Sequence, residues 1–180
     1  MEKNVFLIKW YGPFKNLDTI KDWEIEQPFK CSLYLIQGKR KYAKTRDRYY
    51  CGMSSERKVF ERLRDNNHHI GEIKRLGSIY VGFLANIKRP NKSQIKLAEK
   101  LLTACLTDLV GVDNVLNITN TLFPSENVFV INEWWKTSGE SIWERRPKNA
   151  PSNIIPDVLT YRINDNNEID LYGCKKLKRI

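Results

Sequence analysis

The stretch "SLYLIQGKRKYAKTRDRYYCGMSS", residues 32–55, decides the fold. Two short apolar runs, each carrying tyrosine, flank residues 38–48, which hold six lysines or arginines against one aspartate. Apolar runs on either side of a polar, glycine-containing connection predict a β-hairpin with a long loop. We therefore expect strands at 32–37 and 48–53, with the basic segment joining them.

Similar apolar runs, bounded by glycine, proline or asparagine, predict strands on both sides of this hairpin. They cover residues 4–11 (ended by Gly12-Pro13), 78–87, 127–131, 157–164 and 168–172. A serine cap, Ser54 or Ser55, predicts a short helix that runs to about Arg64. The clearest helix runs from Ser93, its expected N-cap, to about Val110, where Gly111 closes it. This mixture of strands and helices predicts an α+β fold.

The helix predicted at 93–110 carries one charge on its apolar face. At about 100° per residue, one arc collects Ile95, Ala98, Leu102, Cys105, Leu106 and Leu109. Glu99 falls inside the same arc. A carboxylate in apolar surroundings is costly unless it is paired or binds a metal. Glu99 is therefore a candidate metal ligand or a member of a buried ion pair.

The length of 180 residues fits one core with extensions. We expect residues 30–123 to form this core as a small central antiparallel sheet flanked by helices. Residues 1–29 would add an N-terminal strand, and residues 124–180 would form an accessory β-rich tail.

The positive charge of the chain is concentrated in the hairpin loop. The whole chain has a net charge of +10, yet residues 1–30 carry five lysines against five acids. Counterion release from nucleic acid rewards each added lysine or arginine, so a local cluster predicts phosphate contacts. The candidate phosphate-binding residues are Lys39, Arg40, Lys41, Lys44, Arg46 and Arg48.

The four cysteines have no CxxC spacing, and no apolar run reaches about 18 residues. These observations argue against a zinc site, a disulfide framework and a membrane span. We expect a soluble, intracellular protein of the cytoplasm.

The order of tyrosine strand, tyrosine strand with glycine, arginine helix, strand and glutamate helix resembles the GIY-YIG nuclease family over roughly residues 30–120. SLY at 32–34 stands where the family has Gly-Ile-Tyr, although its glycine is missing, and YCG at 50–52 stands for Tyr-Ile-Gly. Arg62 in FERLRD matches the helix arginine, with Arg57 as the alternative. Glu99 in IKLAEKLL matches the metal-binding glutamate.

Two further family positions have weaker matches. The family often has a histidine one turn after the arginine, where this chain has Asn66. We take His68 as its equivalent, with His69 as the alternative. Asn117 in VLN is the best match to the family's asparagine, and we expect it on the DNA-binding surface.

The resemblance implies a DNA endonuclease, of restriction or phage type, that hydrolyses double-stranded DNA with one Mg²⁺ or Mn²⁺ ion. Glu99 would be the single protein ligand, since Mg²⁺ keeps several waters and takes other ligands from phosphate. Arg62 would offset phosphoryl charge. Nearby positive charge would lower a tyrosine pKa, so that Tyr34 acts as base with Tyr50 as its orienting partner, or the reverse. The resemblance leaves a homodimer open.

Two alternatives without catalytic activity would place the chain in other classes of protein. The fold could serve as a catalytically inactive nucleic-acid-binding module, or the aromatic tail could belong to a protein-interaction adaptor. In either case Tyr34 and Tyr50 would be ordinary sheet aromatics. Glu99 would then form a structural ion pair with Arg62.

Overall fold

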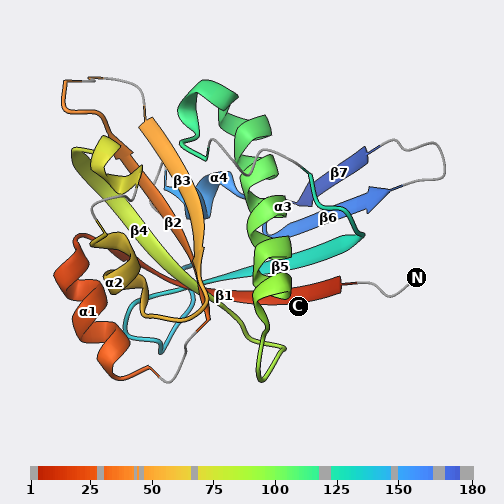
Figure 1. Ribbon diagram of the computed structural model, residues 1–180, viewed down its shortest axis with the longest axis horizontal. Helices are drawn as coiled ribbons and strands as arrows, with labels where there is room; N and C mark the ends of the chain where they lie inside the picture. Colours follow the sequence, from red (N-terminus) through yellow and green to blue (C-terminus); the bar gives the residue numbers. More distant parts are fainter. Residues whose placement is uncertain are drawn as a thin grey trace.

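A computed structural model describes residues 4–27, 31–42, 44, 47–65, 69–117, 123–146, 150–163 and 169–174. Seven strands form one sheet in the order β3-β2-β4-β1-β5-β6-β7 (Figure 1). The strands are β1 (Asn4–Phe14), β2 (Ser32–Lys39), β3 (Asp47–Ser54), β4 (Arg75–Leu84), β5 (Val128–Trp135), β6 (Val158–Ile163) and β7 (Ile169–Cys174). The helices are α1 (Leu17–Ile25), α2 (Val59–Leu63), α3 (Lys92–Val110) and α4 (Pro151–Ile154), with short 3-10 turns η1 (His69–Glu72) and η2 (Val112–Asn114).

The predicted α+β class is confirmed, but the sheet is neither small nor purely antiparallel. Strand β1 pairs in parallel with β5, from Asn4 opposite Val128 to Tyr11 opposite Trp135. The other pairings are antiparallel. Strands β5, β6 and β7 of the predicted tail therefore continue the same sheet. The sequence pattern could not reveal this, because an apolar strand does not specify its pairing partner.

Alternation along the strands sends side chains into two separate cores. Helix α3 covers one face of the sheet, in a core that contains Phe6, Ile8, Trp10, Leu33, Leu35, Cys51, Ile95, Ala98, Leu102 and Leu106. Helices α1 and α2 cover the other face, in a core that contains Phe14, Ile20, Tyr34, Ile36, Val59, Leu63, Ile79, Val81 and Phe83. Neighbouring residues of β2, such as Leu33 and Tyr34, thus face different helices.

Several predicted boundaries differ from the structure. Strand β1 continues through Gly12-Pro13 to Phe14, with a register shift after Tyr11. Helix α2 begins only at Val59, because residues 55–57 form a bend after β3. Its expected serine caps are therefore wrong.

Helix α3 agrees with the prediction more closely. It begins at Lys92, and its N-cap is Asn91 rather than Ser93: the Asn91 side chain accepts a hydrogen bond from Gln94 N at 2.9 Å. Gly111 caps its end, as predicted, with φ of 84°. Leu109 is 43% exposed, so the last residue of the predicted apolar arc lies outside the core.

Candidate functional site

Tyr34 and Tyr50 lie on the same face of neighbouring strands. Tyr34 is opposite Gly52 and Ile36 is opposite Tyr50, which makes the two tyrosines diagonal neighbours. Their ring centroids are 5.9 Å apart with an interplanar angle of 22°. The two hydroxyls share a hydrogen bond, which raises the pKa of Tyr34 and lowers that of Tyr50.

Gly52 is required where the Tyr34 ring crosses the edge strand. A Cβ atom at residue 52 would lie 2.4 Å from the Tyr34 hydroxyl oxygen and 2.4 Å from its Cζ atom. Real Cβ atoms do not approach other atoms this closely. Because Tyr34 is only 1% exposed, its ring has little room to move aside. The glycine thus lets the Tyr34 hydroxyl reach the outer strand of the sheet.

Glu99 belongs to the helix on the other face of the sheet from the two tyrosine rings. It is 5% exposed and lies on α3, which covers the face opposite to the tyrosine rings. The thiol of Cys51 on β3 lies 4.0 Å from the carbonyl oxygen of Glu99, so this part of α3 is in contact with β3. The negative charge of Glu99 contributes to raising the pKa of both Tyr34 and Tyr50. The charge of Glu99 thus influences both phenols, although α3 covers the opposite face of the sheet.

Arg62 on α2 acts on the same two tyrosines with the opposite sign. Its positive charge lowers the pKa of Tyr34 and of Tyr50. Its guanidinium also lies 3.3 Å from the carboxylate of Asp65, which is paired with Arg57 as well. Of the two candidate arginines, Arg62 is the one whose charge influences the pKa of both phenols.

The expected decrease of the tyrosine pKa is not found. Burial is the largest effect on both groups and raises the pKa of each. The charge of Tyr50 adds to the increase at Tyr34, and the charge of Glu99 adds to the increase at Tyr50. Burial of a phenolate away from water raises the pKa by more than the positive charge of Arg62 lowers it. In this state both phenols are neutral hydrogen-bonding groups.

The side chain of Asn117 is buried and holds the edge strand β3 in place. It does not lie on an exposed surface. Its Oδ1 accepts a hydrogen bond from Cys51 N at 3.0 Å while its amide donates to Cys51 O. The backbone of Leu116 also donates to Tyr49 O at 2.9 Å. We expected Asn117 to contact DNA, but its amide fixes β3 between Tyr50 and Gly52.

The basic residues of the hairpin divide into two groups. Lys39, Arg40 and Arg48 have partners within the chain, which are Lys44 O and Asp47 for Lys39, Glu72 for Arg40 and Asn114 for Arg48. Lys41 and Lys44 have exposed side chains, and the Lys41 ammonium lies 5.2 Å from the ring centroid of Tyr42. Arg46 and His68 lie outside the described residues, and the side chain of His69 is not described.

Among the described residues, the candidate site offers few side chains that could bind a metal ion. It therefore fits only a cation that needs few protein ligands. Within the described ranges, no group of three or more His, Cys, Asp or Glu side chains could hold a metal ion. Mg²⁺ commonly takes one or two carboxylates and fills its other positions with water and phosphate oxygens. One carboxylate, that of Glu99, is enough for this smaller requirement.

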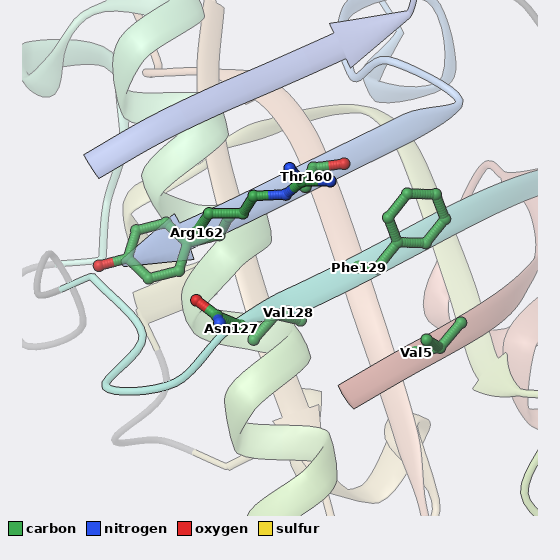
Figure 2. A pocket seen from close by; sticks show the side chains of 7 residues that line it. Val5, Asn127, Val128, Phe129, Thr160 and Arg162 are labelled. Atoms are coloured by element: carbon green, nitrogen blue, oxygen red, sulfur yellow. The ribbon is translucent and has the colours of Figure 1, made fainter. Parts of the chain in front are cut away.

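A hollow of about 450 Å³ lies elsewhere, on strands β1, β5 and β6 (Figure 2). Its lining includes the cross-strand row Val5, Phe129 and Thr160, with Arg162 beside them. Strand β4 lies between β2 and this region. The hollow is therefore not part of the candidate site at Tyr34 and Tyr50.

In the part of the chain that the structure describes, no helix combines the length and the apolar character needed to cross a membrane. Comparison of the chain with protein-family models, with curated proteins and with solved structures finds no match.

Proposed function

We propose that this protein is a divalent-metal-dependent DNA endonuclease of the GIY-YIG type. The observation that carries the proposal is the stacked pair of Tyr34 and Tyr50 on neighbouring strands, in the core that also holds α2, the helix of Arg62. The charges of Arg62 and Glu99 both influence this pair of phenols. A carboxylate, a guanidinium and two phenols supply a metal ligand, a phosphate-binding cation and groups that hydrogen-bond water. These are the elements that phosphodiester hydrolysis requires.

Tyr50 is the better candidate to contact the attacking water, and Tyr34 to orient Tyr50. Tyr50 is half-buried, whereas Tyr34 is almost completely buried. The hydrogen bond with Tyr34 favours the ionised form of Tyr50, since it lowers the pKa of Tyr50. We therefore propose the reverse of the assignment preferred from the sequence, with Tyr50 as the base and Tyr34 as its orienting partner.

Arg62 would hold a phosphate oxygen through charge-assisted hydrogen bonds. Asp65, which shares its carboxylate between Arg57 and Arg62, would keep the guanidinium in place before DNA arrives. A Mg²⁺ or Mn²⁺ ion held by Glu99 would supply stabilisation of the departing 3′ oxygen.

The basic hairpin is suited to hold the DNA backbone at a fixed distance from this site. Lys39 is five residues beyond Tyr34 on β2, which corresponds to roughly 17 Å at the usual rise of a strand. That distance is about five base pairs of duplex DNA, because base pairs are spaced by about 3.4 Å. The exposed ammonium groups of Lys41 and Lys44 would therefore contact phosphates about half a helical turn from the cut.

One observation supports a binding module without turnover as the second candidate: both phenols have a raised pKa, and neither is ready to accept a proton. Incubation of supercoiled plasmid with the purified protein, in Mg²⁺ and in excess chelator, separates the two. The nuclease proposal predicts nicked or linear plasmid in Mg²⁺ and none in chelator. A gel shift without any cleavage in Mg²⁺ or Mn²⁺ would instead favour the binding module.

A further inference from the structure

Glu24 on α1 caps the helix that carries Arg62. The Glu24 side chain is 2% exposed, although it belongs to a helix whose other acids lie at the surface. Its Oε1 accepts a hydrogen bond from Val59 N and its Oε2 from Phe60 N, both at 2.9 Å. These amides belong to the first turn of α2, whose N–H groups have no partners within the helix. One buried carboxylate thus satisfies two of them.

Lys58 makes the reciprocal contact. Its ammonium donates to the carbonyl oxygen of Glu24 and, at 2.8 Å, to that of Gln27, at the C-terminal end of α1. A carboxylate at a helix N-terminus and a cation at a helix C-terminus both match the helix dipoles. At the other end of the helix pair, Arg64 lies 3.0 Å from Asp18 in an exposed ion pair. The two helices therefore lie side by side, and Figure 1 shows them together at one corner of the sheet.

Helix α2 depends on this support because it has only five residues. Helices this short are not stable by themselves in water. Val59 and Leu63 anchor one side of α2 in the core that also holds Tyr34, but apolar contacts do not fix the helix along its axis. The two hydrogen bonds to Glu24 are directional, so they fix the helix along its axis. Arg62 lies two residues after Phe60, so its place depends on the same bonds.

We propose that Glu24 is a positioning residue that holds Arg62 beside Tyr34 and Tyr50 by fixing the start of α2. The proposal rests on the endonuclease function proposed above. Glu24 acts through the backbone of α2. A carboxylate is suited to the task because both of its oxygens are acceptors.

Glu24→Gln is the matched test, because it keeps the shape of the side chain but turns one acceptor into an NH₂ donor that faces a backbone N–H group. Asp18→Asn removes the exposed ion pair of the same two helices and serves as the control. The proposal predicts that Glu24→Gln lowers the single-turnover rate of plasmid cleavage by at least tenfold, since displacement of a group by about 1 Å can cost on the order of 100-fold. Asp18→Asn should cleave at the rate of the unmodified protein, and Glu24→Asp should recover part of the loss.

A second readout does not depend on cleavage. The Nε–Hε NMR signal of Arg62, assigned from its loss in Arg62→Lys, should shift in Glu24→Gln and not in Asp18→Asn. If the unmodified protein cleaves no DNA, the endonuclease proposal fails and the NMR signal alone decides the role of Glu24. An unchanged Arg62 signal, or wild-type cleavage by Glu24→Gln, overturns the proposal. Should Glu24→Gln fail to fold, the same two readouts are taken from Glu24→Asp.

Discussion

At the scale of single residues, Gly52 and Tyr34 form the tightest fit in the candidate site. Gly52→Ala would force the Tyr34 ring away from β3, because the new methyl group would overlap its hydroxyl end. Overpacking of this kind costs about 1–3 kcal/mol in the free energy of unfolding. We also expect DNA cleavage to be lost. Urea unfolding and a plasmid assay measure the two effects.

Gly71→Ala is the control for this substitution, because a Cβ atom there meets nothing within 4 Å. It should leave both the stability and the cleavage rate unchanged. A Gly52→Ala protein as stable and as active as Gly71→Ala would show that the packing of Tyr34 on β3 is not needed.

Buried tyrosines predict a loss of stability in alkali. Burial, together with the charge of Asp47, raises the pKa of Tyr49 to about 12, and burial raises the pKa of Tyr80 to about 12 despite its bond to Ser152. Both phenols ionise near pH 10 in the unfolded chain, so unfolding becomes easier once the pH exceeds 10. Their contribution is complete below pH 10 and is lost as the pH rises towards 12.

Urea denaturation at a series of pH values from 8 to 11.5 checks this prediction. The free energy of unfolding should fall above pH 10, and the fall should be shallower in Tyr80→Phe, which cannot ionise. A free energy that stays constant to pH 11.5 would contradict the raised pKa values.

At the scale of elements, the basic hairpin makes a quantitative prediction about DNA binding. Each phosphate contact contributes about 0.9 to the slope of log K against log salt concentration. Lys41→Ala combined with Lys44→Ala should therefore reduce the magnitude of that slope by about 1.8. Fluorescence anisotropy with a labelled duplex at several salt concentrations measures it.

Lys92 and Lys96, both exposed on α3, are the control pair for this experiment. Their replacement by alanine should change the slope much less, since we assign them no part in the DNA interface. Equal effects of the two double substitutions would mean that the hairpin is not the preferred contact.

Elements with strong local signals were predictable, and those defined by distant contacts were not. The hairpin of β2 and β3 and the Gly111 end of α3 follow from local residue pattern. Helix α1 was not predicted, because contacts that stabilise it come from α2, about 35 residues away. For the same reason the role of Glu24 could not be predicted from the sequence.

The candidate site also has features that the local sequence predicts and features that depend on distant contacts. Tyr34, Tyr50, Arg62 and Glu99 could be selected from the order of motifs. The structure pairs the two tyrosines, whereas Glu99 lies on the helix that covers the opposite face of the sheet. The direction of the tyrosine pKa could not be predicted, because it depends on burial. Nor could the backbone contact of Asn117, which exists only once residue 117 lies beside β3.

At the scale of the whole molecule, the continuous sheet makes strands β2, β3, β4 and β1 depend on the C-terminal strands. Trp134 on β5 is fully buried and stacks on Trp10 of β1 with centroids 5.5 Å apart, and Asn132 accepts a hydrogen bond from the Trp10 indole at 2.8 Å. Removing residues 124–180 would expose this side of β1 to water. We predict that the shortened chain does not fold.

Circular dichroism and thermal unfolding check the prediction, with a chain that lacks only residues 175–180 as the control. The control should unfold in one transition near the temperature of the full chain. A chain of residues 1–123 with a cooperative unfolding transition would show instead that the C-terminal strands are a separable addition.

The central claim is that Glu99, Arg62 and the two tyrosines form one metal-dependent catalytic site. The most direct measurement is the single-turnover rate of Mg²⁺-dependent plasmid cleavage by Glu99→Gln, compared with Asp108→Asn, an exposed acid on the same helix. Our account predicts that Glu99→Gln keeps its fold and its DNA binding but loses on the order of 100-fold or more in rate, whereas Asp108→Asn retains the full rate. Cleavage by Glu99→Gln at the rate of Asp108→Asn would contradict the account.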